Sequence, residues 1–301
     1  PSAMVFHYGQ AVFEGLKAYK TKNGKIILFR PLKNMERLNM SNDRLCIPPI
    51  DTSFAIEAIK TLVKLDKGWI PSREGTSLYI RPFIISTDPY LGVRPSNTYK
   101  FIIILSPVGA YYPEGINPVK IYVEDYYVRS TKGGLGHVKA SGNYAASLKA
   151  QKEASKKGYT QVLWLDGVEK KYIEEVGTMN VFFVIKGEVI TPSLEGSILP
   201  GITRDSVIHL LKSWNIKITE RKISIDEVFD AHANGTLDEA FGTGTAAVIS
   251  PIGGLNWNEK LITINNEKTG ELAQKLYNFI TGIQSGEIED TFGWTVEIEQ
   301  A

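Results

Sequence analysis

A lysine set among glycines is the first feature of this sequence that could do chemistry. Lys139 stands in Gly133-Gly-Leu-Gly-His-Val-Lys-Ala-Ser-Gly-Asn-Tyr144, a stretch with four glycines. Glycine lets the backbone approach a bound ligand closely. A lysine whose pKa is lowered by burial or by cationic neighbours can form a Schiff base with an aldehyde. A solvated loop lysine would give the same pattern, so this stretch alone leaves both interpretations open.

Two adjacent carboxylates form the second feature. Glu174 and Glu175 lie in Tyr172-Ile-Glu-Glu-Val-Gly-Thr-Met-Asn180, just before a Gly-Thr turn. Neighbouring side chains on a strand point to opposite faces, so only one of the two carboxylates can face a given site. A buried carboxylate needs a partner, and a protonated pyridine nitrogen would be one. Taken alone, the motif favours a surface turn with solvated acids.

Two turns rich in glycine and threonine could bind a phosphate. Leu199-Pro-Gly-Ile-Thr-Arg204 runs directly into an expected helix, and helix N-termini offer N–H groups and positive potential to an anion. Phe241-Gly-Thr-Gly-Thr-Ala246 follows an expected strand and lacks the Gly-Lys-Ser/Thr that would complete a Walker sequence. Without further context, both could be ordinary turns.

Composition and charge exclude several other classes of protein. The 301 residues carry 34 Lys and Arg against 33 Asp and Glu, a balance that gives no reason to expect a nucleic-acid or membrane partner. No apolar run approaches the ~20 residues that cross a bilayer. Cys46 is the one cysteine, and no signal peptide is visible, which favours a cytoplasmic location. The sequence starts at Pro1 and enters dense motifs at Phe6, so we expect a missing N-terminal segment.

The elements that must position these residues form a mixed α/β pattern in two domains. The stretch from Pro107 to Pro118 is rich in proline and glycine and has no apolar period, which indicates an interdomain loop at 108–118. We therefore expect a small α/β domain at 1–107, N-terminally incomplete, and a large domain at 119–301.

Hydrophobic periodicity and turn residues predict the individual elements. Expected strands lie at 25–29, 76–86, 99–107, 120–124, 160–165, 179–185 and 188–190, and expected helices at 51–67, 142–157, 203–214, from 224 and at 269–281. Asp51 or Thr52 can cap the first helix, and Ser224 with Glu227 forms a capping box. In the helix at 142–157 we expect Ala145, Leu148 and Ala154 to face inward.

Each motif is weak alone, but their combination and order closely resemble the branched-chain-amino-acid aminotransferases. The matching runs are Phe13-Glu-Gly-Leu-Lys-Ala18, Phe29-Arg-Pro31, Asn34-Met-Glu-Arg37, Gly75-Thr-Ser-Leu-Tyr-Ile-Arg-Pro82, Pro107-Val-Gly-Ala-Tyr111, Lys139-Ala-Ser-Gly-Asn-Tyr144, Gln161-Val-Leu-Trp-Leu165, Glu175-Val-Gly-Thr-Met-Asn180, Leu199-Pro-Gly201 and Phe241-Gly-Thr-Gly-Thr-Ala246. The resemblance covers the chain from Phe6 onward and points to the larger, eukaryotic-type branch. It implies the fold-type IV architecture of enzymes that depend on pyridoxal 5'-phosphate, with 119–301 as the domain that binds this cofactor.

The resemblance also assigns roles around the cofactor. Lys139 would form the covalent link to it and then move a proton between the substrate Cα and the cofactor. Glu175 would pair with the pyridine nitrogen, leaving Glu174 as the outward neighbour, and Tyr144 would hydrogen-bond the phenolic oxygen. The residues implied at the phosphate are Arg37, Ile202, Thr203 and Thr245.

A second set of residues would bind the substrate. The implied wall of an apolar pocket is Tyr8, Phe13, Tyr79 and Tyr111, with core packing as the alternative for any one of these aromatics. Arg81 would reach the distal carboxylate of glutamate, and the backbone of Thr245 and Ala246 would meet the substrate carboxylate. Leu91 and Val93 sit where this family sends a loop in from the partner subunit, an interface that Tyr8 would also cross.

The activity implied is reversible, ping-pong transamination of L-leucine, L-isoleucine and L-valine with 2-oxoglutarate, through the pyridoxamine form, in a homodimer that needs no metal. Animal members with a Cys-X-X-Cys pair have it where this chain has Ala247-Val-Ile-Ser250, which excludes redox control through that pair. Alternatives on the same fold are D-amino-acid aminotransferase and aminodeoxychorismate lyase. A non-catalytic binding protein is disfavoured by the joint presence of Lys139, Glu175, Arg37 and Tyr144.

Overall fold

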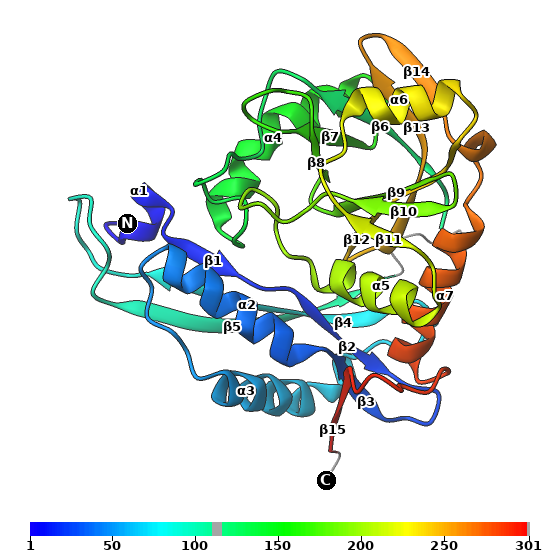
Figure 1. Ribbon diagram of the computed structural model, residues 1–301. Coiled ribbons are helices and arrows are strands. Elements are labelled where there is room, and N and C mark those ends of the chain that lie inside the picture. The colour runs from blue at the N-terminus through cyan, green and yellow to red at the C-terminus, as the bar shows by residue number, and fades with distance from the viewer. Residues whose placement is uncertain (110–115, 300–301) are drawn as a thin grey trace. The chain divides into compact units, whose positions relative to one another are not determined.

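The computed structural model describes residues 1–109 and 116–299, and the chain divides into two compact units. The first unit comprises Pro1–Pro113, Val138–Gly142 and Phe279–Ala301, and the second comprises Glu114–His137 and Asn143–Asn278. The two units are interleaved along the chain (Figure 1). Both combine helices with sheets, which confirms the predicted mixed α/β class.

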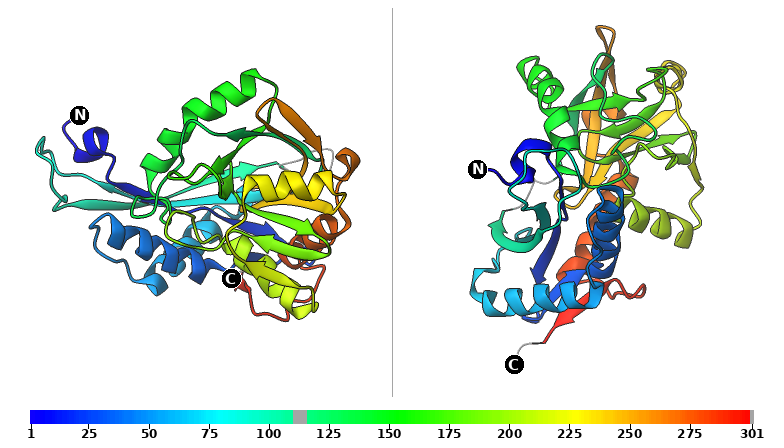
Figure 2. Two further views of the ribbon diagram at one scale, coloured as in Figure 1. Left: turned by 45° about the horizontal axis from the view of Figure 1, so that its top comes forward. Right: turned by 90° about the vertical axis from the view of Figure 1, so that its left-hand side faces the viewer.

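The first unit is built on a six-stranded antiparallel sheet in the order β1-β4-β2-β3-β15, with β5 paired to β4. Its strands are β1 (Ala11–Phe13), β2 (Leu16–Lys20), β3 (Ile26–Phe29), β4 (Ser77–Ser86), β5 (Tyr99–Val108) and β15 (Thr295–Ile298). Its helical segments are α1 (Met4–Tyr8), α2 (Pro31–Arg44), α3 (Thr52–Leu65) and the short turn η1 (Lys67–Trp69). Helices α2 and α3 lie side by side and contribute to one hydrophobic core with the sheet (Figure 2).

Alternation along β4 explains how this sheet serves both a core and a site. Leu78, Ile80 and Ile84 are buried in the hydrophobic core, whereas Tyr79 and Arg81 are half-buried on the opposite face. The predicted helix at 51–67 is confirmed as α3, and its predicted cap is confirmed as well, since the Asp51 carboxylate accepts a hydrogen bond from Phe54 N at 2.8 Å.

The predicted division at 108–118 differs from these units in two places. Strand β15 pairs with β3, so the C-terminal residues complete the first sheet instead of extending the domain predicted at 119–301. Residues 138–142 run against β1 through a bridge between Val12 and Ala140, and therefore also belong to the first unit. Residues 110–115 of the predicted loop lie outside the described residues.

The second unit holds a nine-stranded mixed sheet in the order β11-β10-β9-β12-β13-β6-β7-β8, with β14 paired to β13. Its strands are β6 (Val119–Glu124), β7 (Gln161–Leu165), β8 (Ile173–Val176), β9 (Asn180–Ile185), β10 (Glu188–Thr191), β11 (Ile218–Glu220), β12 (Leu237–Gly244), β13 (Val248–Trp257) and β14 (Lys260–Thr263). The associated helical segments are α4 (Ser141–Lys156), α5 (Ile202–Ser213), α6 (Ile225–Ala233), η2 (Asn265–Glu267) and α7 (Glu271–Ser285), of which α4 begins in the first unit and α7 ends in it. Every residue of β8 and β9 is buried, so both faces of these strands are covered.

In this unit the predicted hairpin turn and helix cap are confirmed, whereas the predicted buried face of α4 is partly wrong. Lys186 and Gly187 both have positive φ in the tight turn of the predicted β9–β10 hairpin, and Ser224 Oγ caps α6 by accepting from Glu227 N at 3.0 Å. The predicted inward face of α4 is wrong for Ala145 and Leu148, which are exposed.

The buried stripe of α4 runs instead through Asn143, Ala150 and Ala154. The two alanines pack on Val162 and Trp164 of β7. Asn143 is also buried, and its Nδ2 donates a hydrogen bond to the carbonyl of Leu135 at 2.8 Å. Small and polar residues therefore occupy the buried face, which weakens its apolar period. Among residues 1–109 and 116–299, no helix combines the length and apolar character needed to cross a membrane.

Candidate active site

Lys139 is fixed through its backbone to two elements of the first unit. Its carbonyl accepts a hydrogen bond from Phe13 N of β1 at 3.2 Å. Its own N–H donates to Ser41 Oγ of α2 at 2.9 Å. Ser41 Oγ in turn donates to the carbonyl of Arg37, one turn earlier on the same helix. These bonds on both sides of Cα set the direction in which the lysine side chain leaves the backbone.

Buried charges surround the lysine amine. The Arg37 guanidinium and the Glu14 carboxylate form two parallel bonds, Nε to Oε1 at 2.8 Å and Nη2 to Oε2 at 2.9 Å. Burial pushes the pKa of the Glu14 carboxyl upward, but the charge and hydrogen bonds of Arg37, together with the charge of Lys139 and the hydrogen bond from Asn34, outweigh it and hold the pKa below its ordinary value. Burial lowers the pKa of Lys139 to about 8, with Arg37 adding to the lowering and Glu14 opposing it. Such a pKa leaves a substantial neutral fraction, as a nucleophilic amine requires.

Three of the residues predicted to bind substrate gather around this lysine. The ring centroid of Phe13 lies 4.8 Å from Lys139 Nζ and 4.6 Å from Arg81 Cζ. Arg81 Nη2 donates to Tyr79 Oη at 2.9 Å. A Cβ on Gly15 would lie 2.1 Å from that hydroxyl, so the close approach of Tyr79 requires glycine there. The structure therefore brings apolar rings and a cation together next to the amine.

The other predicted substrate residues of this unit form a separate, exposed group. The Tyr8 hydroxyl on α1 donates to the carbonyl of Leu91, in the connection between β4 and β5. Leu91 and Val93 are 66% and 84% exposed. Tyr111 lies outside the described residues.

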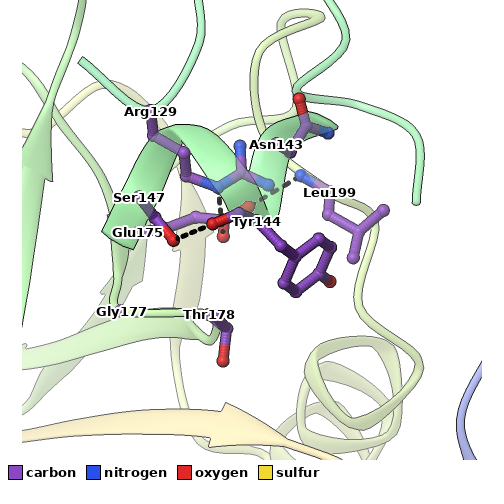
Figure 3. A pocket seen from close by; sticks show the side chains of 8 residues that line it. All are labelled: Arg129, Asn143, Tyr144, Ser147, Glu175, Gly177, Thr178 and Leu199. Carbon is purple, nitrogen blue, oxygen red and sulfur yellow. Dashed lines mark hydrogen bonds and ion pairs between the residues drawn. The ribbon is translucent and has the colours of Figure 1, made fainter. Parts of the chain in front are cut away.

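A pocket of the second unit contains Tyr144 and Glu175 (Figure 3). The Glu175 carboxylate is buried between two donors: Oε2 lies 3.0 Å from Arg129 Nε, and Oε1 accepts from Leu199 N at 2.8 Å. Figure 3 shows Tyr144 projecting from α4 into the same pocket. The remaining lining residues are Asn143, Ser147, Gly177 and Thr178. The pocket thus places a fixed anion and a phenol beside one another.

Arg129, whose guanidinium pairs with Glu175 in this pocket, was not singled out from the sequence. Besides Glu175, its guanidinium donates to the carbonyls of Ser197 at 2.8 Å and Gly136 at 3.1 Å. Its neighbours Ser130, Thr131 and Lys132 make this stretch look like a polar loop. The only available signal was indirect, because a buried carboxylate at Glu175 requires a cation or several N–H donors.

The expectation that Glu174 lies outward in solvent is wrong. Its carboxylate has a different hydrogen-bond partner from that of Glu175, but the residue is 6% exposed instead of lying on an outward face in solvent. The chain around Ser197 covers that face of β8, and Ser197 Oγ donates to Glu174 Oε1. Burial raises the pKa of Glu174 to about 7.

The predicted phosphate-binding residues are divided between the units. Ile202 and Thr203 form the first turn of α5, whose N-cap is Gly201. A Cβ on Gly201 would lie 2.0 Å from Asn180 Oδ1, and Asn180 Nδ2 also holds the carbonyl of Leu199 at 2.9 Å. Both contacts fix the chain segment that leads into α5. The second predicted turn joins β12 to β13, where Thr245 is half-buried and Ala246 is exposed, whereas Arg37 belongs to the first unit.

Residues 11–254 match the family model of class IV aminotransferases. The chain belongs to this family. As a class IV aminotransferase, it is 65% identical to branched-chain-amino-acid aminotransferase 2 of Bacillus subtilis over 99% of this chain and 82% of that protein. It is 57% identical to branched-chain-amino-acid transaminase 1 of the same organism, over 99% and 84%.

Solved structures agree with this assignment. The T.th. branched-chain amino acid aminotransferase with pyridoxamine 5'-phosphate matches with a TM-score of 0.86 at 28% identity, over 99% of this chain and 92% of that one. The Escherichia coli branched-chain amino acid aminotransferase matches with a TM-score of 0.83 at 28% identity, over 99% and 93%. The family and the fold predicted from the sequence are thereby confirmed.

The low pKa of Lys139 makes its reactivity testable in this aminotransferase without a cofactor. Since only the neutral amine reacts, its rate of modification by trinitrobenzenesulfonate should rise through about pH 8 instead of through the ordinary value of 10.5. Peptide mass mapping of the protein labelled at several pH values measures this for Lys139 alone. A rate that still rises steeply above pH 10 would show that the amine is not perturbed.

The ion pair between Arg129 and Glu175 predicts a large stability effect. Arg129→Met removes the cation beside a buried carboxylate, which should lower the free energy of unfolding by about 3–5 kcal/mol, measured by urea denaturation. The double variant Arg129→Met/Glu175→Met removes both charges and should recover most of that loss. If the single variant costs under about 1 kcal/mol, the pair does not hold this pocket together.

Proposed function

We propose that this chain is a pyridoxal-phosphate-dependent branched-chain-amino-acid aminotransferase. It transfers the amino group reversibly between L-leucine, L-isoleucine or L-valine and 2-oxoglutarate, in a ping-pong reaction through the pyridoxamine form. The observation that carries the proposal is Lys139, a lysine of lowered pKa with Phe13 and Arg81 beside it, in a chain 65% identical to a branched-chain-amino-acid aminotransferase. The relatives' names favour this activity over the D-amino-acid aminotransferase and aminodeoxychorismate lyase alternatives.

The residues present fit the cofactor's three polar groups. A protonated pyridine nitrogen needs an anion in a buried place, and Glu175 is such an anion, held by Arg129 and Leu199 N. The aldehyde needs an amine with a low pKa, which Lys139 has. The phosphate needs N–H donors and a cation, which the start of α5 and Arg37 can supply. When bound, the cofactor supplies a ring that takes up electrons from the substrate Cα.

In this proposal three side chains act on protons and electrons at the ring. Lys139 would hold the cofactor through its amine and, once the substrate amine has released it, would act as a free base that moves a proton between the substrate Cα and the cofactor. Glu175 keeps a proton on the pyridine nitrogen, which preserves the ring's capacity to accept electrons. Tyr144 would donate a hydrogen bond to the phenolic oxygen.

The phosphate is held by groups that differ in kind. Ile202 N–H and the Thr203 and Thr245 hydroxyls provide directed donors, and Arg37 provides the charge. The helix dipole adds positive potential at the start of α5. Because α5 begins at a fixed N-cap, the donors of Ile202 and Thr203 are in place before the anion arrives.

Substrate choice follows from Phe13, Tyr79 and Arg81. Phe13 and Tyr79 offer apolar ring surface to a branched aliphatic side chain. Arg81 can pair with the distal carboxylate of glutamate, and its Nε is buried without a hydrogen-bond partner among the described residues, which leaves a donor for that anion. Thr245 and Ala246 would meet the substrate's own carboxylate through their backbone.

The remaining assignments concern assembly and location. The exposure of Leu91 and Val93 favours a second subunit that covers them, so we propose a homodimer in which these residues, with Tyr8, complete the partner's pocket. Tyr111 would be a wall residue of the substrate pocket. A cytoplasmic location is consistent with a single cysteine, Cys46.

Absorbance spectroscopy tests the proposed function directly. Protein loaded with pyridoxal phosphate should show a near-UV/visible band that shifts when L-leucine is added and returns with 2-oxoglutarate. D-leucine should leave the band in place, and Lys139→Ala should abolish multiple turnover. A loaded protein whose band ignores L-leucine would refute the proposal.

A further inference from the structure

We infer that Glu14 is a positioning residue of this active site, which fixes the orientation of Arg37 with a negative charge that also acts electrostatically on Lys139. Its side chain is fully buried, and neither composition nor spacing singled it out within Phe13-Glu-Gly15. The inference rests on the proposed function, since it assigns a purpose to Glu14 only if Lys139 and Arg37 serve the cofactor.

The carboxylate of Glu14 has little freedom to rotate. Oε1 accepts from Arg37 Nε at 2.8 Å, while Oε2 accepts from Arg37 Nη2 at 2.9 Å, from Asn34 Nδ2 at 2.8 Å and from Gly15 N at 3.1 Å. A bidentate pair of this kind fixes the plane of the guanidinium as well as its distance. Arg37 is therefore held in one orientation by the carboxylate.

The backbone that carries Glu14 is fixed as well. Glu14 N donates to the carbonyl of Pro82 in β4 at 2.7 Å. Asn34 Nδ2 also reaches the carbonyl of Gly15 at 3.3 Å, and Tyr79 excludes any side chain at that glycine. Helix α2 brings Asn34 and Arg37 to this point from successive turns. The carboxylate is thus anchored to β4 and α2 together.

The pairing decides how Arg37 can meet a phosphate. Glu14 occupies the edge of the guanidinium formed by Nε and Nη2, so a phosphate must approach away from that edge. An unrestrained arginine could rotate and present a different fork to an anion. Glu14 thereby limits Arg37 to one mode of contact, and the anion meets a cation that is already oriented.

Glu14 also acts on the charge of Lys139. The groups that influence the amine are Arg37 on α2, Tyr79 and Arg81 on β4, and Glu14 itself. Burial, Arg37 and Arg81 lower the pKa of the amine, whereas Glu14 and Tyr79 raise it. An amine with too low a pKa is a weak base for a proton at Cα, so Glu14 limits the loss of basicity.

Two substitutions of Glu14 separate the effect of its charge from the effect of its size and reach. Glu14→Gln keeps the size and removes the charge, Glu14→Asp keeps the charge and withdraws it from Arg37, and Glu36→Gln on the exposed side of α2 is the matched control. Each cofactor-free protein is titrated with pyridoxal phosphate and with pyridoxal, which lacks the phosphate, across a range of pH. The absorbance band gives the affinity and the pH midpoint of lysine reaction, and thermal unfolding reports whether each variant is folded.

Glu14→Gln should move the pH midpoint of Lys139 downward and weaken pyridoxal phosphate about tenfold or more, with a much smaller effect on pyridoxal. Glu14→Asp should weaken pyridoxal phosphate while it keeps the pH midpoint close to wild type, and this variant carries the test if Glu14→Gln does not fold. Glu36→Gln should change neither quantity.

Two failures can be told apart. A wild-type protein that forms no band with pyridoxal phosphate contradicts the proposed function itself. A wild-type band, combined with a folded Glu14→Gln protein of unchanged midpoint and unchanged affinity, contradicts the inference alone. Equal weakening of pyridoxal and pyridoxal phosphate would show that Glu14 does not act through Arg37.

Discussion

Removing a carboxylate from water costs several kcal/mol unless a cation or N–H donors replace the lost hydration. Each unit of this chain contains such a carboxylate beside an arginine: Glu14 with Arg37 in the first, and Glu175 with Arg129 in the second. In both cases backbone N–H groups complete the match, Gly15 N in the first and Leu199 N in the second. The local structure around each pair follows from the need to keep these donors in place.

In the first unit this requirement explains the polar stripe on α2. Asn34 and Arg37 face Glu14, and Ser41 one turn further holds the backbone of Lys139. The glycine at position 15 allows Tyr79 to approach, which in turn brings its hydroxyl to Arg81. In the second unit Arg129 donates to the carbonyls of Ser197 and Gly136, so the segment before α5 is held in place by the same guanidinium that neutralises Glu175.

Much of the fold could be predicted because its elements carry strong local signals. Helix α3 has both an apolar stripe and an Asp51 cap, and the β9–β10 hairpin has a two-residue turn with positive φ. Helix α2 was not predicted from periodicity, because Asn34, Arg37 and Ser41 are polar residues in buried positions. The pairing of β15 with β3 joins residues from opposite ends of the chain, which no local pattern indicates.

The residues of the candidate site also fall into those that could be predicted from the sequence and those that could not. Lys139, Glu175 and the glycine-rich turns were found because their types and order match a known family, whereas Glu14 and Arg129 were not singled out. Glu14 acts through its ion pair with Arg37, and Arg129 acts through its ion pair with Glu175. A polar residue that acts through another one leaves no signal in spacing, although a buried charge predicts that such a partner exists.

The central claim is that Lys139 is the residue that binds the cofactor covalently, and borohydride reduction tests it most directly. Reduction of the protein loaded with pyridoxal phosphate makes the linkage permanent, and peptide mass mapping then locates it. The added mass should appear on the peptide that contains Lys139. Lys17, whose pKa burial also lowers to about 8, is the natural internal control and should stay unlabelled. A label on Lys17 or on another lysine, with Lys139 unmodified, would contradict the account.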